Sequence, residues 1–524
     1  MIITLDGKSL TFDQIETFLN TPHPPPLPDG ERVGVRVQVA TKTIKQLKKV
    51  RAYVEQKITS HEPFYGINTG FGMLAHKKIS DRDLDRLQEN LIISHAVGVG
   101  DPLPLNISRL IMLLRANVLA AGYSGIKPET LHLLVLMMNR GVTPVIPEKG
   151  SVGASGDLAQ LSHIALAMIG RGLAWYRGGQ MASSQALKRA GLLPIILAPK
   201  EGIALINGTQ AMAAIAASCL IRAKSILKLA DIAGALSVEG DRASKQPFDK
   251  RIHAIRPHPG QIATASNIRR LIEGSQIIAG HEKCKRVQDP YSFRCIPQVH
   301  GAVKDAYHYS YGIVERELNS CTDNPLIFCD DDDIISGGNF HGEPLAFAMD
   351  MLGIALAELG SISERRVAIL LSPLENELPV KYLVMDAGLN SGLAPLHVTM
   401  ASIVSENKTF AHPASVDSIP TFAGQEDHVS MGFFAARKTV TIVENLENIL
   451  AIEILAGCQA VDIGRSFRTR PGKGSGAALK TIRNEVSFLG RDREVLVDFE
   501  KCLKLVRDGS LIHAVEKACG PLKI

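Results

Sequence analysis

The stretch GTQAMAAIAASCLIRAKSILKLADIAGALSVE, residues 208–239, is rich in Ala, Leu and Ile and contains no proline. Its apolar residues recur at three- and four-residue spacing, which predicts one helix longer than the average globular helix. Two further stretches, 344–371 and 433–461, share this length and composition. Helices so long and so apolar pack against other helices on several sides. We therefore expect a mainly α fold, built on a bundle of long helices, and an oligomer.

The length of the chain points to more than one folding unit. Its 524 residues exceed what one hydrophobic core usually holds. We expect a first domain over residues 1–205, with mixed secondary structure, and a long-helix domain over 206–524. Within the first, VGVRVQV (33–39) alternates like a short strand. Farther along, the run DDDDII (330–335) lacks the Gly and Glu spacing of an EF-hand loop and is expected to be a solvated turn beside a strand.

Composition and charge exclude several classes of function. Hydrophobic residues make up 45% and charged residues 21%, as in an ordinary globular protein. The five excess positive charges are spread along the chain, so we expect no nucleic-acid partner. The eight cysteines never form CxxC and are expected to be free thiols. The N-terminus lacks a signal-peptide pattern, and polar residues 207–210 interrupt the longest uncharged stretch, 202–221. We therefore expect a cytoplasmic protein without a membrane span.

Glycine- and proline-rich loops separate the long segments, and loops on a rigid frame are where sites form. One of them, GSVGASGDL (150–158), contains the small triplet Ala154-Ser155-Gly156. It is not a nucleophile elbow, because the second glycine of G-x-S-x-G comes one place early. Nor is it a phosphate cradle, because Asp157 follows where a P-loop needs lysine. One remaining interpretation is a glycine turn with Asp157 or Ser155 near a helix N-cap.

A second interpretation is chemical, with the backbone itself reacting. If the Gly156 amide nitrogen reaches the Ala154 carbonyl carbon, a five-membered ring closes with loss of water. Loss of the Ser155 hydroxyl as a second water then leaves an exocyclic methylene. Gly156 has no Cβ to block this approach, and Gly153 permits strained dihedral angles. The product would be an electrophile that no ordinary side chain supplies.

The order of motifs along nearly the whole chain resembles the aromatic amino acid ammonia-lyase family. The motifs are YGINTGFG (65–72), SHAVGVGDPL (94–103), GSVGASGDL, EGIALINGT (201–209), RPHPGQ (256–261), QDPYSFRCIPQV (288–299), TDNPLIF (322–328), GGNFHGEP (337–344), SENK (405–408), AHPASVDSIPT (411–421) and QEDHVSMG (425–432). The resemblance implies a fold like that of fumarase and aspartase, and a homotetramer whose sites draw loops from several subunits. It also implies the ring 4-methylidene-imidazole-5-one (MIO), formed autocatalytically from Ala154-Ser155-Gly156, with no metal and no external cofactor.

The resemblance also assigns roles to single residues. It makes Tyr65 the base that removes the β-proton, for which its pKa near 10 must fall by about three units, or ~4 kcal/mol, through nearby positive charge or helix N-termini. Arg294, three residues after Tyr291, is expected to clamp the substrate carboxylate with its two-pronged donor group. The other implied residues are catalytic Tyr291 and Glu426, substrate-binding His95, Asn207, Gln288 and Phe340, and Asp157 in ring formation.

His95 and Glu426 imply the substrate, because family members that act on an imidazole substrate have His and Glu at these positions. A buried carboxylate facing a benzene ring loses its hydration at a cost of several kcal/mol, whereas an imidazole N–H satisfies it. We therefore expect elimination of ammonia from L-histidine to give trans-urocanate, the first step of histidine degradation. A tyrosine or phenylalanine ammonia-lyase or aminomutase stays an alternative, since Ala394 and Pro395 depart from the family pattern near the ring.

Two interpretations of other kinds stay open. A lyase of the same architecture can work with acid and base side chains alone, without the ring. An inactive helical scaffold protein can keep the loops for assembly. Intact mass distinguishes the ring-free lyase from the ring-bearing one, because ring formation removes two waters from the encoded chain. A substrate panel distinguishes an inactive scaffold from an enzyme.

Overall fold

The computed structural model describes residues 1–21, 34–59, 62–70, 72–74, 76–280, 286–372, 378–464 and 469–524. These residues form two compact units, each made of three segments. The first unit comprises Met1–Ser218, Tyr311–Met349 and Pro413–Arg437, and the second comprises Cys219–Ser310, Asp350–His412 and Lys438–Ile524. This division by compactness does not test a domain boundary between residues 205 and 206, which stays a prediction.

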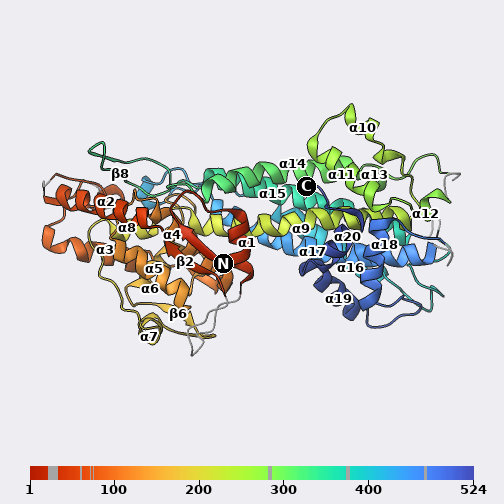
Figure 1. Ribbon diagram of the computed structural model, residues 1–524, viewed down its shortest axis with the longest axis horizontal. Coiled ribbons are helices and arrows are strands. Elements are labelled where there is room, and N and C mark those ends of the chain that lie inside the picture. Colours follow the sequence, from red (N-terminus) through yellow and green to blue (C-terminus); the bar gives the residue numbers. More distant parts are fainter. Residues whose placement is uncertain are drawn as a thin grey trace. The chain divides into compact units, whose positions relative to one another are not determined.

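Among the described residues, four long helices contribute to both units. They are α9 (Gln210–Gly240), α14 (Ile296–Glu317), α15 (Glu343–Leu371) and α17 (Gly432–Gly464) (Figure 1). The stretches 208–239, 344–371 and 433–461 correspond to α9, α15 and α17, which confirms the three predicted helices and the mainly α fold.

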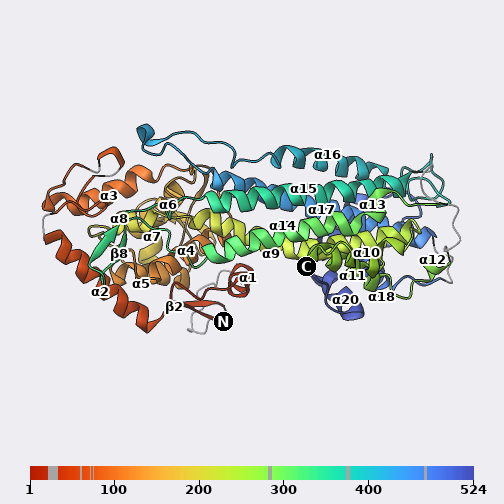
Figure 2. The same ribbon diagram turned by 90° about the horizontal axis from the view of Figure 1, so that it is seen from above.

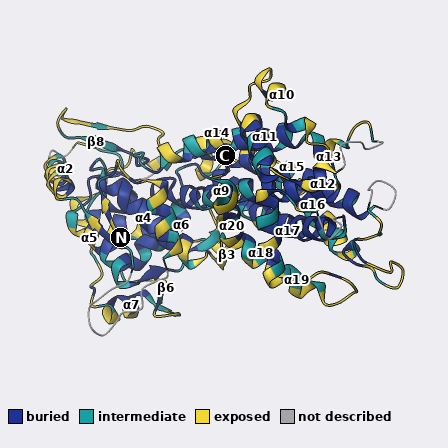
Figure 3. Cartoon of the chain, turned by 45° about the vertical axis from the view of Figure 1, so that its right-hand side comes forward, coloured by how far each residue is buried: buried dark blue, intermediate teal, exposed yellow. Residues whose placement is uncertain are grey.

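Small residues let these helices approach one another within the second unit. A Cβ added at Gly457 of α17 would lie 2.8 Å from Cβ of Leu236 in α9, and one at Gly360 of α15 would lie 3.0 Å from Ile449 in α17. Figure 2 shows the axes of α14, α15 and α17 roughly parallel to one another, and the chain runs along α14 in the opposite direction to α15 and α17. Close packing on several sides explains why most residues of α9 are apolar and buried. Figure 3 colours much of this helical interior as buried, whereas the short α10 (Lys250–Ala254) is mostly exposed.

One described helix, α15, is long and apolar enough to cross a membrane by length and composition alone. In its most apolar window, 61% of the residues are buried inside the protein. Such burial is what a core helix of a helical bundle shows.

The first unit mixes short strands with helices, as predicted for the N-terminal part. Among its described residues, β1 pairs with β2 in parallel, and antiparallel pairing joins β3 with β5, β4 with β6, β6 with β7, and β8 with β9. The strand predicted over 33–39 is β2, and the acidic run at 330–335 forms an exposed turn that leads into β9, as predicted. The elements are β1 (Ile2–Leu5), α1 (Phe12–Asn20), β2 (Arg36–Val39), α2 (Thr41–Thr59), η1 (Gly72–Leu74), η2 (Asp81–Asp83), α3 (Leu84–His95), β3 (Val99–Pro102), α4 (Leu105–Ala120), α5 (Pro128–Arg140), β4 (Thr143–Pro144), β5 (Pro147–Lys149), α6 (Leu158–Met168), β6 (Leu173–Tyr176), β7 (Gly179–Ala182), α7 (Ser183–Arg189), α8 (Glu201–Ile206), β8 (Leu326–Phe328), β9 (Asp333–Ile335) and η4 (Phe422–Gly424).

The second unit adds shorter helices around the long ones. They are η3 (Gln246–Phe248), α10, α11 (Pro259–Leu271), α12 (Gln276–Ala279), α13 (Tyr291–Arg294), α16 (Ala394–Phe410), α18 (Lys473–Glu485), α19 (Val495–Arg507) and α20 (Ser510–Cys519).

A buried polar cluster in the second unit holds the last residues of the chain. Asp231 in α9 accepts a hydrogen bond from Lys304 Nζ at 2.6 Å and lies 2.9 Å from His300 Nδ1. Lys304 also donates to the backbone carbonyl of Lys523 at 3.2 Å. Asn267 accepts the backbone N–H of Lys523 at 2.9 Å and donates to its carbonyl at 2.7 Å. Because buried charges need partners, this cluster ties the C-terminal segment to the helices.

Candidate active site

The Ala154-Ser155-Gly156 triplet lies in the loop before α6, with Asp157 at the N-cap position. The side chain of Asp157 makes no capping hydrogen bond to that helix. It accepts one from Ser151 Oγ at 2.9 Å and one from the backbone N–H of Met212, in the first turn of α9, at 2.8 Å. Asp157 thus stands at the N-cap, as the first interpretation of the loop has it, but its carboxylate does not cap the helix and instead ties the loop to α9.

Asp157 is fully buried, and this environment changes its protonation. Burial raises the pKa of its carboxyl group to about 7, although the Met212 N–H and the Ser151 hydroxyl oppose the shift, and the nearby Glu317 carboxylate adds to it. Burial acts in this direction because it disfavours the charged form. Near neutral pH, the Asp157 carboxyl group can thus hold or release a proton next to the triplet.

The last residue of the triplet, Gly156, is in close contact with Gly208. Gly156 pairs with Gly208, and the N–H of Asp157 donates to the Gly208 carbonyl at 2.7 Å. The φ angle of Gly156 is +68°, and a Cβ on this residue would lie 2.1 Å from the Gly208 oxygen. Only glycine fits this conformation and this space. The contact explains physically why glycine occupies the third place of the triplet.

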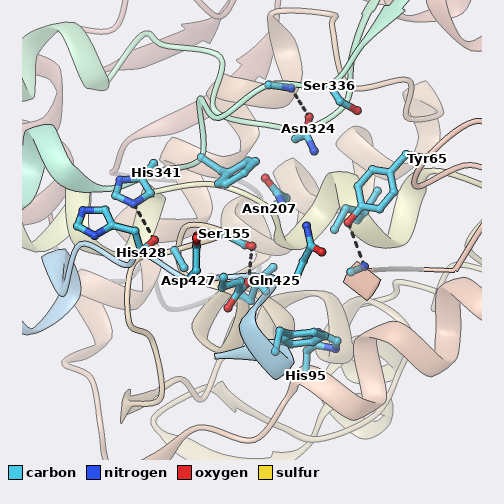
Figure 4. Close-up of a pocket in the computed structure, with 18 of the residues that line it drawn as sticks. Tyr65, His95, Ser155, Asn207, Asn324, Ser336, His341, Gln425, Asp427 and His428 are labelled. Atoms are coloured by element: carbon cyan, nitrogen blue, oxygen red, sulfur yellow. Dashed lines mark hydrogen bonds between the residues drawn. The ribbon is translucent and has the colours of Figure 1, made fainter. Parts of the chain in front are cut away.

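Ser155 opens into a cavity of about 500 Å³ in the first unit (Figure 4). Loops from all three segments of the unit line the cavity, with Tyr65 on the side opposite His341 and His428. The sequence-predicted residues that line it are Tyr65, His95, Ala154, Ser155, Asn207, Phe340 and Glu426.

Several polar residues of the cavity were not singled out from the sequence. They are Asn324, Ser336, His341, Gln425, Asp427 and His428. The rings of His341 and His428 stack with centroids 5.8 Å apart. Most of these residues belong to the motifs TDNPLIF, GGNFHGEP and QEDHVSMG. Their position inside these motifs was the sequence signal that could have identified them.

Glu426 is held by two hydroxyl groups. Ser155 Oγ donates to its Oε1 at 2.7 Å, and Thr421 Oγ1 donates to its Oε2. No ion pair involves Glu426 among the described residues. Its carboxylate faces Ser155 inside the cavity.

His95 is the last residue of α3 and lines the same cavity as Glu426. Its Nδ1 lies 2.9 Å from the Leu91 carbonyl oxygen, so the ring also caps its own helix. A carbonyl only accepts, and Nδ1 must therefore carry the proton, which leaves Nε2 of the neutral ring as an acceptor. Burial lowers the pKa of His95 and favours this neutral form, against the opposite effects of the Leu91 carbonyl and Glu426.

Tyr65 lines the cavity, and the backbone N–H of Gly72 donates to its hydroxyl at 3.5 Å. Burial raises its pKa above the ordinary value, Glu426 adds to the rise, and the Gly72 N–H opposes it. The expected lowering by nearby positive charge or helix N-termini is thus wrong for the single chain. Tyr65 needs a further positive charge if it is to act as a base near neutral pH.

Asn207 ends α8 rather than opening α9. It is 4% exposed, and its Oδ1 has no hydrogen-bond partner among the described residues. Its backbone carbonyl accepts a hydrogen bond from Nη1 of the fully buried Arg115 at 2.8 Å. A buried amide with an unpaired oxygen on a cavity wall is suited to bind a polar ligand group.

Gln288, Tyr291 and Arg294 belong to the second unit, and none of them is among the described residues that line the cavity of the first. The Arg294 guanidinium lies 4.3 Å from the centroid of the Tyr291 ring, so the two side chains share one side of α13, as their spacing predicted. Tyr291 is 69% exposed. Ala394 and Pro395, at the start of α16, also belong to the second unit.

Comparisons with known proteins agree with this geometry. The sequence profile of the family described as "aromatic amino acid lyase" matches residues 30–484. A histidine ammonia-lyase of Myxococcus xanthus is 50% identical over 516 residues, which cover 98% of this chain and 99% of that protein.

Solved structures give the same result. The crystal structure of histidine ammonia-lyase from Trypanosoma cruzi has a TM-score of 0.88 and 41% identity over 99% of this chain and 96% of that one. Tyrosine aminomutase from Streptomyces globisporus has a TM-score of 0.91 and 35% identity over 100% of both chains. The matched fold, the nearly full-length identity and the polar cavity around Ser155 lead to one conclusion: the chain belongs to the aromatic amino acid lyase family.

Proposed function

We propose that this chain is a histidine ammonia-lyase that converts L-histidine to trans-urocanate and ammonia, the first step of histidine degradation. The observation that carries the proposal is that Glu426 and His95 both line the cavity that contains Ser155, close enough for the Glu426 carboxylate to act on the pKa of His95. Glu426 and the Nε2 atom of His95 are acceptors, and an imidazole ring offers them one N–H group when it is neutral and two when it is protonated. A phenyl ring would leave Oε1 of Glu426 without a donor once the Ser155 hydroxyl is lost, since Thr421 holds only Oε2, at a cost of several kcal/mol.

We propose that Ala154-Ser155-Gly156 condense to MIO, and three features of the loop fit this group. Ala154 is buried, and Gly156 contacts Gly208 where no side chain fits. Asp157, the next residue, has a carboxyl group whose pKa is raised to about 7. The ring would supply an electrophile for the substrate amine, which makes that amine a better leaving group. No metal or external cofactor is needed for this chemistry.

In this proposal the other residues bind and orient the substrate. Glu426 and His95 hold the imidazole ring, and the Nδ2 group of Asn207 donates to the substrate carboxylate or to the carbonyl of the MIO ring. Phe340 covers the cavity from the segment before α15, and Tyr65 takes the β-proton at its hydroxyl oxygen. Each of these residues lines the cavity.

We further propose a cytoplasmic homotetramer in which Gln288, Tyr291 and Arg294 of one subunit complete the cavity of another. Two observations support this. The three residues lie outside the first unit, and the pKa of Tyr65 is raised in the single chain although a base needs it lowered. A guanidinium arriving from a neighbouring subunit would supply that missing positive charge and clamp the substrate carboxylate.

A substrate panel tests the proposal. Purified protein mixed with histidine, tyrosine or phenylalanine should release its conjugated acid, seen by ultraviolet absorbance, most rapidly from histidine. Tyrosine turnover equal to or above that of histidine would favour the alternative, because a phenol O–H can also donate to His95 Nε2 and a tyrosine aminomutase is among the similar structures. No turnover of any of the three would favour an inactive scaffold.

Two substitutions test the proposed site. Ser155→Ala should abolish turnover and leave the assembly intact, since the methylene cannot form without the hydroxyl. Glu426→Gln should lower kcat/KM for histidine by a factor of 100 or more, on the order of 3 kcal/mol, with little effect on folding. Kinetics with size-exclusion chromatography measure both. An active Ser155→Ala protein would contradict the mechanism.

A further inference from the structure

Residues 421–426 form a closed loop at the wall of the cavity. The backbone N–H of Thr421 donates to the Glu426 carbonyl at 2.9 Å, and the N–H of Glu426 donates to the Thr421 carbonyl at 3.3 Å. The Thr421 hydroxyl also donates to the Glu426 carboxylate. Three hydrogen bonds thus join the two ends of the loop and fix the path of the four residues between them.

Two successive residues of this loop have a backbone conformation that side chains other than glycine rarely adopt. The φ angle is +50° at Phe422 and +55° at Ala423, both in the left-handed region. For a residue as bulky as Phe422 this conformation is a real exception. Such strain persists only where the surrounding structure imposes it, and it is concentrated at functional sites. The closed loop therefore holds Phe422 in a place that an unconstrained chain would not choose.

The Phe422 ring lies against two other parts of the cavity wall. It stacks on the His95 ring, with centroids 5.8 Å apart and planes 25° from parallel. A Cβ added at Gly72 would lie 3.1 Å from Cδ1 of Phe422, so the ring also lies close to the loop whose N–H donates to the Tyr65 hydroxyl. Phe422, His95 and Gly72 all line the cavity. The strained loop thus brings an aromatic face onto a residue of the proposed substrate site.

We propose that Phe422 is a positioning residue that aligns His95 for recognition of the substrate ring, a role that rests on the proposed function. Among the described residues, both polar contacts of the His95 ring, to the Leu91 carbonyl and to Ser94 Oγ, are made by Nδ1. They fix one edge of the ring and leave it free to tilt about that edge. A stacked aromatic face restricts the tilt, so the Nε2 lone pair, which lies in the ring plane, keeps one direction.

This role affects binding of the substrate and not the bond-breaking step. His95 contacts the substrate ring, which keeps its bonds during elimination, so its hydrogen bond stabilises the bound substrate and the transition state about equally. Loss of its alignment should therefore raise KM and leave kcat nearly unchanged. Phe422 is 49% exposed, so its side chain adds little to the core, and its removal should not unfold the chain.

Steady-state kinetics of the full-length enzyme with L-histidine test this role. Phe422→Ala should raise KM about 3- to 10-fold, as expected for the loss of one aromatic stacking contact, with kcat within about twofold of the wild type. Phe422→Tyr keeps the aromatic face and should restore a KM close to that of the wild type. Ala423→Gly is the matched control, because it changes the neighbouring strained residue, which does not line the cavity. It should keep the wild-type KM.

A double-mutant cycle establishes whether Phe422 acts through His95. Phe422→Ala added to His95→Ala should change kcat/KM for histidine by less than about twofold, since no imidazole remains to be aligned. An equal loss in the wild-type and His95→Ala backgrounds overturns the inference, because Phe422 would then act by itself. An unchanged KM in Phe422→Ala, or a fall in kcat alone, also overturns it.

These outcomes are separate from a failure of the proposed function. Circular dichroism and intact mass establish that each variant folds and has lost two waters. Should Phe422→Ala not fold, Phe422→Leu replaces it, since leucine fills much of the same space without an aromatic face, and a wild-type KM in that variant overturns the role. A wild-type protein that does not turn over histidine contradicts the proposed function itself, whereas normal turnover with unaffected Phe422 variants contradicts only the alignment of His95.

Discussion

At the scale of the residue, the site depends on groups whose chemistry their surroundings have changed. The residue types were visible in the sequence: a small triplet, a tyrosine, a histidine and two acids. The protonation states of the ionisable ones could not be predicted from it. The raised pKa values of Asp157 and Tyr65 arise from burial among residues far apart in the chain, which a motif does not encode.

Asp157 should make stability depend on pH. Its pKa is about 7 in the folded chain and 3.8 in an unfolded one. The folded state therefore binds more protons between these values, and its stability falls as pH rises from about 4 to 7, by up to roughly 4 kcal/mol. Asp157→Asn should lack this loss. Urea unfolding across this pH range, with both chains carrying Ser155→Ala so that neither matures, measures the difference. Parallel pH profiles would contradict the burial of a protonated carboxyl group.

Gly156→Ala should be far more harmful than an alanine at another left-handed glycine. The new Cβ would lie 2.1 Å from the Gly208 carbonyl oxygen, whereas at Gly178, where φ is +83°, nothing lies within 4 Å. Gly178→Ala therefore isolates the conformational cost, about 1 kcal/mol, from the clash. Thermal unfolding and intact mass should show a stable, mature Gly178→Ala protein and a Gly156→Ala protein that is destabilised and has lost no water. Equal behaviour of the two would refute the close contact.

At the scale of the element, the long helices were predictable and the short ones at the site were not. The helices α9, α15 and α17 follow from composition and spacing, because most of their apolar residues are buried. The six-residue helix α8, which Asn207 caps at its C-terminal end, was not predicted from the sequence. Tertiary contacts decided this boundary, since buried Arg115 of α4 binds the carbonyls of Ala204 and Asn207 at the end of α8.

Replacing Arg115 should disturb both the end of α8 and the cavity. Arg115→Met leaves buried carbonyls unpaired and should lower the free energy of unfolding by ~2–4 kcal/mol. It should also reduce kcat/KM, because Asn207 loses its support. Arg115→Lys should recover part of both. Arg109→Met is a matched control: this buried arginine of the same helix binds the Thr21 carbonyl and does not line the cavity. It should lose stability and keep its activity per folded molecule. Urea titration and kinetics measure the two effects.

At the largest scale, the cavity of the first unit is lined by only part of the expected site. Seven predicted residues line the cavity of the first unit, while Gln288, Tyr291 and Arg294 lie in the second unit. The sequence alone gave no spatial reason for this split, because spacing along a chain carries no information about which copy of the chain a loop faces. The resemblance to a tetrameric family supplied the expectation of shared sites.

Mixing two inactive variants should restore activity if sites are shared between subunits. Ser155→Ala removes the reactive triplet, and Arg294→Ala removes the proposed carboxylate clamp. Random mixed tetramers would contain about a quarter of sites with neither change. Turnover after joint refolding, compared with each variant refolded alone, measures this recovery. A mixture no more active than its parts would place the complete site within a single chain.

The hydrogen bonds that Lys304 and Asn267 make to Lys523 have a practical consequence. An affinity tag or a reporter domain fused after Ile524 could strain the hydrogen bonds between the Lys523 backbone and the buried polar cluster. Such fusions are best joined through a long, flexible spacer. Removal of Lys523 by a carboxypeptidase would take away one hydrogen-bond partner of the buried Lys304 ammonium group. We expect the first effect of such trimming, or of a short fusion, to be looser packing of the helices around Lys304.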